Sequence, residues 1–554
     1  MTAYSTLSKE QLIAEIKRLK KGKKFGLIWE DKPEDVAELC KTKLPVLVDV
    51  EEKEIFGEDS TPTNILIEGD NYHALSVLNY THKGKIDVIY IDPPYNTGAK
   101  DWKYNNNYVD INDSYRHSKW LSMMSKRLQL AKNLLNHDGV LIVTIDDNEA
   151  CSLGLLLEEI FPNKERATVV IKYNPAGTAR NGFSRNHEYA YFLLNPGQEI
   201  EKKPAPRDIR DQNLRRHGSG ANRQDSPTMF YPIFIDKKNL KVKGTGDVPT
   251  KDFHPQQQTI DRGKYFEIWP LDEKNKEKRW YYGRERVNTA GRDELICKWK
   301  RDRLHVYFHT DNLSEQKYQS VWIGSEYDAG AHGGSMVRDL IGQQFPFPKS
   351  LYAVRDCLNA VLKNKKSATV LDFFAGSATT GHAVLILNKE DGGNRQFILC
   401  TNNENGIAQE VCYPRIKAVI KGHKDYPDIT GIPASLKYFR TDFVDADPTD
   451  KNKKKLTKMA TEMLCLKEGT FEKITSKKAF KIYKNTNHYT GIIFDQMAIP
   501  DFKEAIAKMG GKFSVYVFSL GDDSFEEEFD DIKQKVKLSP IPEVILRVYK
   551  RIFK

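Results

Sequence analysis

A short apolar strand that ends in two prolines, within KIDVIYIDPPYNTG at residues 85–98, constrains the fold more than any other stretch. Its β-branched run predicts a buried strand. The strand must end at Asp92-Pro93-Pro94-Tyr95, because neither proline can donate to a β-ladder and both fix φ. An acid, a rigid backbone and an aromatic ring are thus presented where open α/β sheets bind ligands. An ordinary exit from a strand into a turn is the alternative interpretation.

This strand belongs to a strand–helix alternation that is interrupted once. Before the interruption we expect strands at 64–70, 86–91, 140–145, 168–173 and 187–194, and helices at 73–78, 118–135 and 149–160. After it we expect a helix at 350–363, a strand at 369–372, a helix at 382–388 and a strand at 396–401. The pattern predicts an α/β fold with a doubly wound, mostly parallel sheet.

A turn of small residues follows the strand at 369–372, in LDFFAGSATTG. Small residues let the backbone approach a nucleotide-like ligand closely. Gly376 and Gly381 have the spacing of a P-loop, but His382 stands where that motif needs lysine, so ATP hydrolysis is disfavoured. Glu404, at the end of the next strand, is placed to hold ribose hydroxyls.

The interruption, residues 196–335, combines basic and aromatic residues. Arginine contacts phosphates and guanine, and aromatic rings stack on unpaired bases, so the segment is a candidate for DNA recognition. Solvated charges and core aromatics are the alternative. The candidate DNA contacts are Arg207, Arg210, Arg215, Arg216, Arg223, Arg284 and Arg286.

These changes in composition and in strand–helix alternation divide the chain into five segments. They are a helical arm and linker at 1–62, with a capped helix at 5–24 and an irregular stretch at 25–62; a first α/β half at 63–195; the recognition segment at 196–335; a second α/β half at 336–425; and a small α/β appendage for assembly or partner contact at 426–554.

Composition excludes several classes of protein. The seven cysteines contain no CxxC pair, which disfavours structural zinc and a disulfide framework. No run of 18 apolar residues and no signal-peptide core occur, so we expect a cytoplasmic protein without membrane contact. Asp146-Asp147 ends a strand without further clustered ligands, and we expect no metal there. The net charge of +10 permits a nucleic-acid partner.

Together the motifs resemble the β class of amino-group DNA methyltransferases, in which DPPY precedes a variable recognition segment and the cofactor turn. NILIEGDNYHAL, VIYIDPPYNTG, FPFPKSL, LDFFAGSATTGHAV and ILCTNNENGIAQEVCYPRIK are most similar to the modification (Mod) subunit of type III restriction–modification systems. The resemblance covers most of residues 25–425. It implies a seven-stranded-type methyltransferase sheet, S-adenosyl-L-methionine as cofactor, double-stranded DNA as substrate, a homodimer and a separate restriction (helicase/nuclease) subunit.

The resemblance also assigns roles by position. Asp92, Pro93, Pro94 and Tyr95 would be catalytic, holding the N6 amine of a flipped adenine. Phe345 and Pro348 would line the far side of the cofactor. The implied cofactor-binding residues are Asp70, Lys349, Ser350, Asp372, Phe374, Ala375, Gly376, Ser377, Thr379 and Glu404.

Two positions depart from the family pattern, because Ala378 replaces a glycine and Ser350 a proline. We expect Ala378 to keep the turn small, although a positive φ there would put cofactor affinity in doubt.

Other interpretations stay open. Cytosine N4 is the alternative target, although those enzymes more often carry serine in place of Asp92. The chain could be a stand-alone methyltransferase without a restriction partner. A DNA-recognition subunit without activity of its own would show a spoiled DPPY or cofactor turn, and neither is spoiled here.

Overall fold

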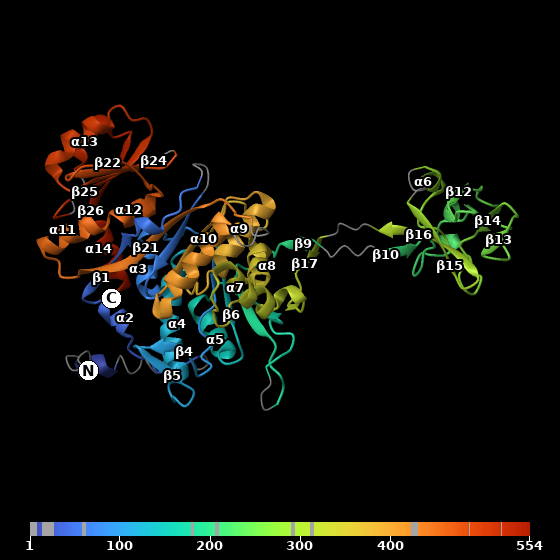
Figure 1. Ribbon diagram of the computed structural model, residues 1–554, viewed down its shortest axis with the longest axis horizontal. Coiled ribbons are helices and arrows are strands. Elements are labelled where there is room, and N and C mark those ends of the chain that lie inside the picture. Colours follow the sequence, from blue (N-terminus) through green and yellow to red (C-terminus); the bar gives the residue numbers. More distant parts are fainter. Residues whose placement is uncertain are drawn as a thin grey trace. The chain divides into compact units, whose positions relative to one another are not determined.

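The computed structural model describes residues 8–13, 27–57, 62–178, 182–204, 210–289, 294–310, 315–422, 430–486, 488–521, 523 and 525–553. The chain forms two compact units, one from Met1–Glu201 with Tyr318–Lys554 and one from Lys202–Lys317 (Figure 1). The second unit lies within the segment predicted to recognise DNA.

A ten-stranded sheet organises the first unit, in the order β1-β21-β2-β20-β19-β3-β6-β8-β7-β18. Its strands are β1 (Lys43–Asp49), β2 (Thr63–Glu68), β3 (Ile86–Ile91), β6 (Leu135–Ile145), β7 (Glu165–Ile171), β8 (Glu188–Leu194), β18 (Val321–Trp322), β19 (Thr369–Asp372), β20 (Gln396–Thr401) and β21 (Ser435–Asp445). The run from β21 to β6 is parallel, whereas β1 and β8 pair antiparallel with their neighbours. The predicted mostly parallel α/β sheet is confirmed.

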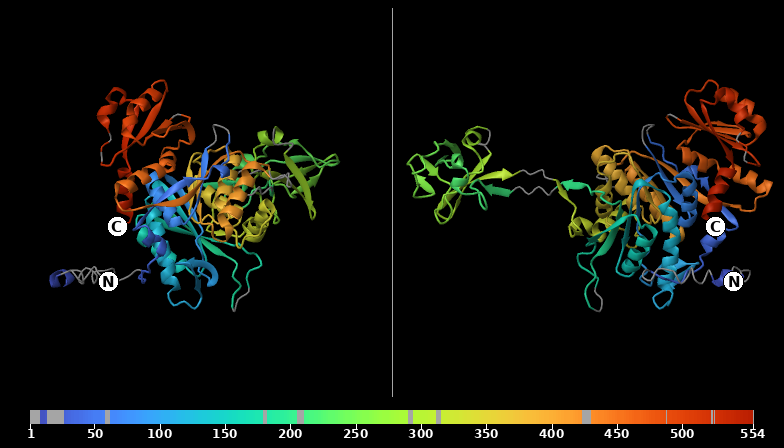
Figure 2. Two further views of the ribbon diagram at one scale, coloured as in Figure 1. Left: turned by 60° about the vertical axis from the view of Figure 1, so that its left-hand side comes forward. Right: turned by 180° about the vertical axis from the view of Figure 1, so that it is seen from behind.

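Helices cover both faces of this sheet, which two views make visible (Figure 2). One face packs against α3 (Asn71–Thr81), α4 (Arg116–Lys132) and α5 (Ala150–Ile160), and the other against α7 (Met336–Ile341), α8 (Leu351–Leu362), α9 (Thr379–Asp391) and α10 (Tyr413–Lys421). Within β3, Ile89 and Ile91 enter the first core, while Val88 and Tyr90 enter the second. This two-residue alternation explains why β3 is apolar throughout. No helix among the described residues is both long and apolar enough to cross a membrane.

Strands β3 and β19 are neighbours at the centre of the sheet, although they lie far apart in the sequence. They pair in parallel, with Val370 opposite Val88 and Leu371 opposite Ile89. The carboxyl ends of both strands therefore meet at one edge, and the DPPY stretch and the small-residue turn both begin there. The two stretches therefore end neighbouring strands of a single sheet.

Two expectations about the ends of the chain are wrong. Residues 25–62 are not irregular throughout, because they contain α2 (Asp35–Leu39) and the edge strand β1. Residues 426–554 are not a separate appendage from their start, because β21 pairs with β2 in the central sheet.

The predicted cap is present: Gln11 N donates to Ser8 Oγ at 3.2 Å, and Ser8 N donates to Gln11 Oε1 at 2.9 Å. The rest of the expected helix, 14–24, lies outside the described residues.

After β21 the chain forms a second, five-stranded sheet in the order β22-β23-β24-β25-β26. These elements are α11 (Asp450–Met459), α12 (Thr461–Glu468), β22 (Glu472–Ser476), β23 (Phe480–Lys484), β24 (His488–Ile493), α13 (Ile499–Ile506), β25 (Lys512–Phe518), β26 (Val536–Ile541) and α14 (Glu543–Ile552). Helices α12 and α14 pack on α3, and Tyr549 of α14 donates a hydrogen bond to the carbonyl oxygen of Pro45.

The second unit consists mainly of short strands and has its own core around Tyr231 and Trp280. Its elements are β9 (Lys202–Pro204), β10 (Arg210–Asn213), β11 (Ile233–Asp236), β12 (Val242–Thr245), β13 (Thr259–Asp261), β14 (Tyr265–Ile268), α6 (Arg284–Asn288), β15 (Leu295–Lys300), β16 (Arg303–Thr310) and β17 (Glu315–Lys317). The predicted loss of strand–helix alternation is confirmed. A two-stranded hairpin, β4 (Ala99–Tyr104) and β5 (Asn107–Asp110), belongs to the first unit.

Candidate active site

The chain leaves β3 through a fixed turn. Trp120 Nε1 of α4 donates to the carbonyl oxygen of Pro94 at 2.7 Å. Asn96 is fully buried with φ of 56°, a left-handed conformation that asparagine tolerates better than most residues. Its side chain donates to Glu149 Oε1 and accepts from Trp102 Nε1 at 3.0 Å. The two prolines therefore sit between anchored points, and the stretch from Asp92 to Tyr95 is held rigidly.

Within the part of the chain that the structure describes, only one oxygen of Asp92 has partners. Thr144 Oγ1, from β6, donates to Asp92 Oδ1 at 2.8 Å, and Lys349 Nζ lies 2.9 Å from the same oxygen. Among the described residues, no hydrogen bond is donated to Asp92 Oδ2 or to the carbonyl oxygen of Pro93. The Asp92 side chain keeps 26% of its surface exposed. Two acceptors are therefore available at the carboxyl end of β3.

Lys349 connects Asp92 to two further groups. Its ammonium lies 3.0 Å from Glu188 Oε2, contacts the Tyr95 hydroxyl and sits 4.4 Å from the centre of the Tyr95 ring. The Tyr95 hydroxyl donates to Glu188 Oε2 at 2.9 Å. Burial by itself lowers the pKa of Lys349, but the attraction of Asp92 and Glu188 outweighs it and raises the pKa above its ordinary value. The amine is therefore held as a cation.

The second stretch, after β19, is organised by Asp372. Its buried carboxylate accepts from Phe374 N at 2.9 Å and from Thr380 Oγ1, in the first turn of α9, at 2.6 Å. Burial raises the pKa of Asp372 to about 7, against the lowering effect of these two hydrogen bonds. Asp372 thus holds the turn from behind rather than facing a ligand.

The backbone of the turn is left-handed at two positions, Gly376 with φ of 48° and Ala378 with φ of 64°. The positive φ considered for Ala378 is therefore present. A left-handed alanine is strained by about 1–2 kcal/mol. Phe345 reaches this turn from the segment before α8, and its ring lies 3.7 Å from where a Cβ on Gly376 would be. Phe345 therefore lines the turn, as the resemblance implies.

A buried cation lies behind the same turn. Arg415 of α10 is fully buried and donates to Ser377 O at 3.1 Å, Ser377 Oγ at 3.1 Å and Thr379 Oγ1 at 2.8 Å. Burial lowers its pKa to about 10. Among the described residues, no carboxylate lies within ion-pair distance of it. The turn thus carries an uncompensated positive charge, which favours an anionic group on its ligand.

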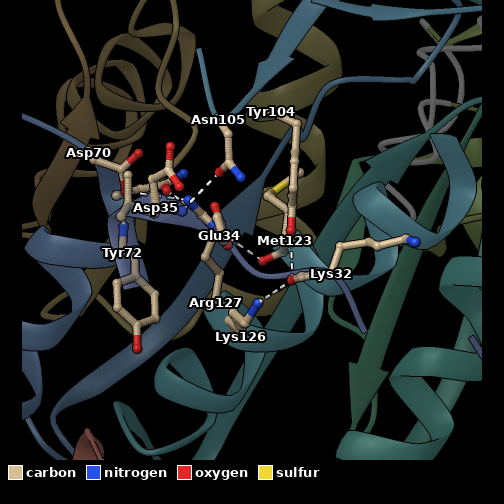
Figure 3. A network of polar contacts seen from close by, with 12 residues as sticks. Lys32, Glu34, Asp35, Asp70, Tyr72, Tyr104, Asn105, Met123, Lys126 and Arg127 are labelled. Carbon is tan, nitrogen blue, oxygen red and sulfur yellow. Dashed lines mark hydrogen bonds and ion pairs between the residues drawn. The ribbon is translucent and has the colours of Figure 1, made fainter. Parts of the chain in front are cut away.

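Asp70 caps α3 at the carboxyl end of β2, where its Oδ1 accepts from Tyr72 N at 2.7 Å. The buried Arg127 of α4 lies 3.3 Å from the same oxygen and 2.8 Å from Glu34 Oε1 (Figure 3). The side chains of Arg127 and Glu34 are 4% and 7% exposed, whereas that of Asp70 is 28% exposed. The network holds Asp70 at the ligand-binding edge of the sheet.

Other residues predicted to bind the cofactor contact neighbouring segments of the protein. Glu404, after β20, is partly exposed and forms an ion pair with Lys103 of β4. Ser350 is a helix cap: its hydroxyl accepts from Ala353 N of α8 and donates to the carbonyl oxygen of Glu326 at 2.7 Å. The ammonium of its neighbour Lys349 lies on Asp92, and the contact of Lys349 with the cofactor stays a prediction.

Asp146 and Asp147, considered and set aside as metal ligands, are paired with one cation. Arg185 lies 3.1 Å from a carboxylate oxygen of each. Among the described residues, no group of three or more histidine, cysteine or acidic side chains is placed to hold a metal ion.

Sequence reasoning missed Glu188, Thr144, Arg127 and Arg415. Glu188 carries the clearest signal, because an acid opens a strand that is otherwise apolar and aromatic, EYAYFLL. A charged residue in that position is buried only when it is paired. Arg127 and Arg415 carry no such signal, because the sequence does not show which of the many arginines on helices is buried.

The candidate DNA contacts differ in their surroundings. Arg215 is 3% exposed, donates to the carbonyl oxygen of Leu271 and pairs with Glu273 at 2.9 Å, so it serves the interior of the second unit rather than its surface. Arg223 donates to the carbonyl oxygens of Phe253 and Thr250 and pairs with Glu277.

Arg284, Arg286 and Arg216 lie outside that interior. Arg284 pairs with Asp247 at 2.7 Å. Arg286 lies over the Tyr282 ring at 3.8 Å, and Arg216 over the Tyr281 ring at 5.6 Å. Arg207 and the side chain of Arg210 are outside the described residues.

Comparisons with known proteins agree with this geometry. A family model described as DNA methylase (N6_N4_Mtase) matches residues 86–410. The EcoPI Mod subunit of a type III restriction–modification enzyme, from Escherichia phage P1, is 30% identical over 393 residues, which cover 63% of this chain and 58% of that subunit. The type II methyltransferase M.KpnI of Klebsiella pneumoniae is 28% identical over 402 residues, covering 70% of this chain and 90% of that enzyme.

Among solved structures, M1.HpyAVI in complex with SAM covers 64% of this chain and 98% of its own, with 12% identity and a TM-score of 0.30, too low to support an argument. The family match is different in kind. It spans more than half of the chain and includes both the DPPY stretch after β3 and the small-residue turn after β19. The chain therefore belongs to the N6_N4_Mtase family of DNA methylases.

Proposed function

We propose that this protein transfers a methyl group from S-adenosyl-L-methionine to the N6 amine of an adenine in double-stranded DNA. The observation that carries the proposal is the pair of unoccupied acceptors, Asp92 Oδ2 and the carbonyl oxygen of Pro93, beside a small-residue turn on the neighbouring strand. An exocyclic amine has two hydrogens to donate, and two fixed acceptors match it.

The residues at the turn fit the proposed cofactor. A methionine moiety carries a carboxylate, and the turn has a buried, uncompensated Arg415 behind it. Arg415 donates to the hydroxyl oxygens of Ser377 and Thr379, which lie 3.3 Å apart and share one hydrogen bond, so one hydroxyl proton is left for an acceptor on a ligand. Glu404 and Asp70, at the ends of β20 and β2, would hold the ribose and adenine ends. When bound, the cofactor supplies a methyl group on a positively charged sulfur.

The protein's own part in the reaction is preorganisation. The lone pair of an adenine N6 amine is delocalised into the ring, which makes the amine a poor nucleophile. Hydrogen bonds to Asp92 Oδ2 and to Pro93 O favour a tetrahedral nitrogen whose lone pair is directed away from the ring. That lone pair forms the new C–N bond, the S–C bonding pair returns to sulfur, and one N–H proton leaves to solvent. Tyr95 would stack on the base, which must leave the duplex to arrive there.

The test is incorporation of labelled methyl groups into duplex DNA by the native chain and by Asp92→Ala. We expect incorporation by the native chain and a loss of at least about 100-fold in the variant, the scale on which single preorganised acceptors act. No incorporation by the native chain into any DNA overturns the proposed activity. Equal incorporation by both chains overturns the assignment of Asp92.

Cytosine N4 is the second candidate target, because the matched family covers both amino groups. Adenine is favoured because Asp92 stands where the resemblance leads us to expect serine in cytosine enzymes. Chromatography of the nucleosides from digested, labelled DNA separates the two: N6-methyladenine supports the proposal and N4-methylcytosine overturns its specificity.

The Mod subunits among the relatives suggest an assembly. We propose a cytoplasmic homodimer that works with a separate restriction subunit, since the EcoPI, StyLTI and EcoP15I relatives are named as Mod subunits of type III restriction–modification enzymes. Sedimentation of the purified chain tests the dimer. Co-purification with the product of an adjacent helicase–nuclease gene tests the partner.

A further inference from the structure

Glu188 is a buried acid for which neither the motifs nor the family match gives a role. It is the first residue of β8, and only 2% of its surface is exposed. Strand β8 runs antiparallel to β6, with Tyr189 opposite Ile145. This register brings the first residue of β8 to the edge where β3 and β6 end, next to Asp92.

One oxygen of Glu188 joins the two functional ends of the DPPY stretch. Its Oε2 lies 3.0 Å from Lys349 Nζ and accepts the Tyr95 hydroxyl at 2.9 Å. Lys349 in turn lies 2.9 Å from Asp92 Oδ1. Glu188 thus directly contacts Tyr95, the residue expected to stack on the base. Through Lys349 it is also connected to Asp92, the residue expected to accept the amine.

The charges explain why this arrangement is fixed. Burial raises the pKa of Glu188, and the attraction of Lys349 opposes that rise. A buried carboxylate of this kind is stable only while its cation stays in place. The Lys349 side chain is 12% exposed and lies within ion-pair distance of both Asp92 and Glu188.

We infer that Glu188 is a positioning residue for methyl transfer, acting through Lys349 and Tyr95. It holds the ammonium on Asp92 Oδ1, so that Oδ2 is left for the target amine. A lysine ammonium has three donors, and without Glu188 it is free to move onto Oδ2, the position that the substrate needs. Glu188 also fixes the Tyr95 ring through its hydroxyl. The inference rests on the proposed function.

The test is Glu188→Gln in the 554-residue chain, with steady-state methylation of duplex DNA measured per cofactor-binding site. We expect kcat to fall by at least about 10-fold, the scale reported for groups that orient a reacting residue. The KM for DNA and the cofactor affinity stay near native values, because the lost interaction acts in the transition state. Glu165→Gln, at the exposed first residue of β7, is the matched control and keeps native kcat.

A second variant covers the possibility that Glu188→Gln disturbs the fold of the site, where Lys349 would keep only Asp92 as an acidic partner. Glu188→Gln with Lys349→Gln replaces the buried ion pair by two neutral amides, and Asp92 keeps its hydrogen bond from Thr144. We expect this double variant to bind cofactor normally and to be no slower than Glu188→Gln alone, since the two residues act as one unit.

Three results would overturn the inference: native kcat in Glu188→Gln, a loss confined to KM or to cofactor affinity, and a double variant that is slower than Glu188→Gln alone. A native chain that methylates no DNA would instead defeat the proposed function. The two failures are therefore distinguishable.

Discussion

Lys103 of the β4–β5 hairpin forms an ion pair with Glu404, the acid expected to hold the ribose hydroxyls of the cofactor. Both side chains are about one-third exposed, at 29% and 34%. The hydrogen bond to Glu404 raises the pKa of Lys103. Because the hairpin directly follows the DPPY stretch, this contact connects the segment proposed to be catalytic to the residue proposed to hold the cofactor ribose.

Removing Lys103 should therefore strengthen cofactor binding. In Lys103→Ala the Glu404 carboxylate can accept hydrogen bonds from the ribose hydroxyls without first losing an ion pair with lysine. We expect a lower dissociation constant for S-adenosylmethionine by titration calorimetry at low salt, and a smaller difference from the native chain at 1 M salt, where exposed ion pairs are screened. Lys43→Ala, which removes a comparable ion pair with Asp445 in edge strand β1, is the control. Weaker binding in Lys103→Ala would show that Lys103 contributes to the cofactor site.

The parts of the site that the sequence predicts are those determined by short-range chemistry. Two prolines end β3, and small residues form the turn after β19, whatever surrounds them. The position of Lys349 depends instead on which strands become neighbours, because Asp92 and Glu188 come from β3 and β8. No local pattern reveals that a lysine following FPFP will reach both.

Prediction of the sheet from the sequence is limited in the same way, because an edge strand can depend on a partner from a distant part of the chain. Strand β1 contains Pro45 and lies in an acidic segment, which argues against a strand in the sequence. It forms because β21 supplies a partner from the far end of the chain, and because an edge strand tolerates proline. The central strands have continuous apolar runs, and all of those expected before and after the interruption are present.

Arg127 is the residue whose loss should destabilise the first unit most. Arg127→Met leaves the buried Glu34 carboxylate without its cation, and breaking a buried pair in this way costs about 3–5 kcal/mol. Lys126→Met on the same helix removes a pair with an exposed Asp31 and should cost within about 1 kcal/mol. Hydrogen exchange of α3 and α4 measures both. Equal protection in the two variants would contradict the role of this network.

The left-handed alanine in the cofactor turn predicts a difference between two glycine substitutions. Ala378→Gly and Ala375→Gly both remove a buried methyl group and both add freedom to the unfolded chain. Only Ala378 has a positive φ, so only its substitution also relieves strain. We expect Ala378→Gly to be more stable than Ala375→Gly by about 1–2 kcal/mol in thermal unfolding. Equal stability would show that the turn relaxes around Ala378.

Asp372 should make the stability of the first unit depend on pH. Its pKa is about 7 in the folded chain, against about 3.9 when unfolded, so between these values the folded chain holds a proton that the unfolded chain has lost. Stability therefore falls as the pH rises from about 4 to about 7. In Asp372→Asn the amide oxygen still accepts from Phe374 N, and the amide nitrogen donates to Thr380 Oγ1; the side chain carries no charge, so the variant lacks this loss.

Urea unfolding of the native chain and of Asp372→Asn measures the effect. We expect the stability of the variant relative to the native chain to increase by up to about 4 kcal/mol between pH 4 and pH 8. Thr380→Val removes one of the hydrogen bonds that lower the Asp372 pKa, so the loss of stability should extend to higher pH than in the native chain. Parallel curves for the native chain and Asp372→Asn would contradict the assignment.

The arginines of the second unit should divide by their surroundings. Arg286 is exposed and lies over the Tyr282 ring, which leaves its guanidinium available to a phosphate. We expect Arg286→Ala to weaken binding of duplex DNA of any sequence and to reduce by about one the slope of log affinity against log salt. Arg215→Met should instead lower the melting temperature of the second unit, because Arg215 is buried with Glu273 and Leu271 as partners. Fluorescence anisotropy across a salt series, with calorimetry of both variants, measures the two effects. An unchanged salt slope in Arg286→Ala would remove that residue from the proposed DNA contacts.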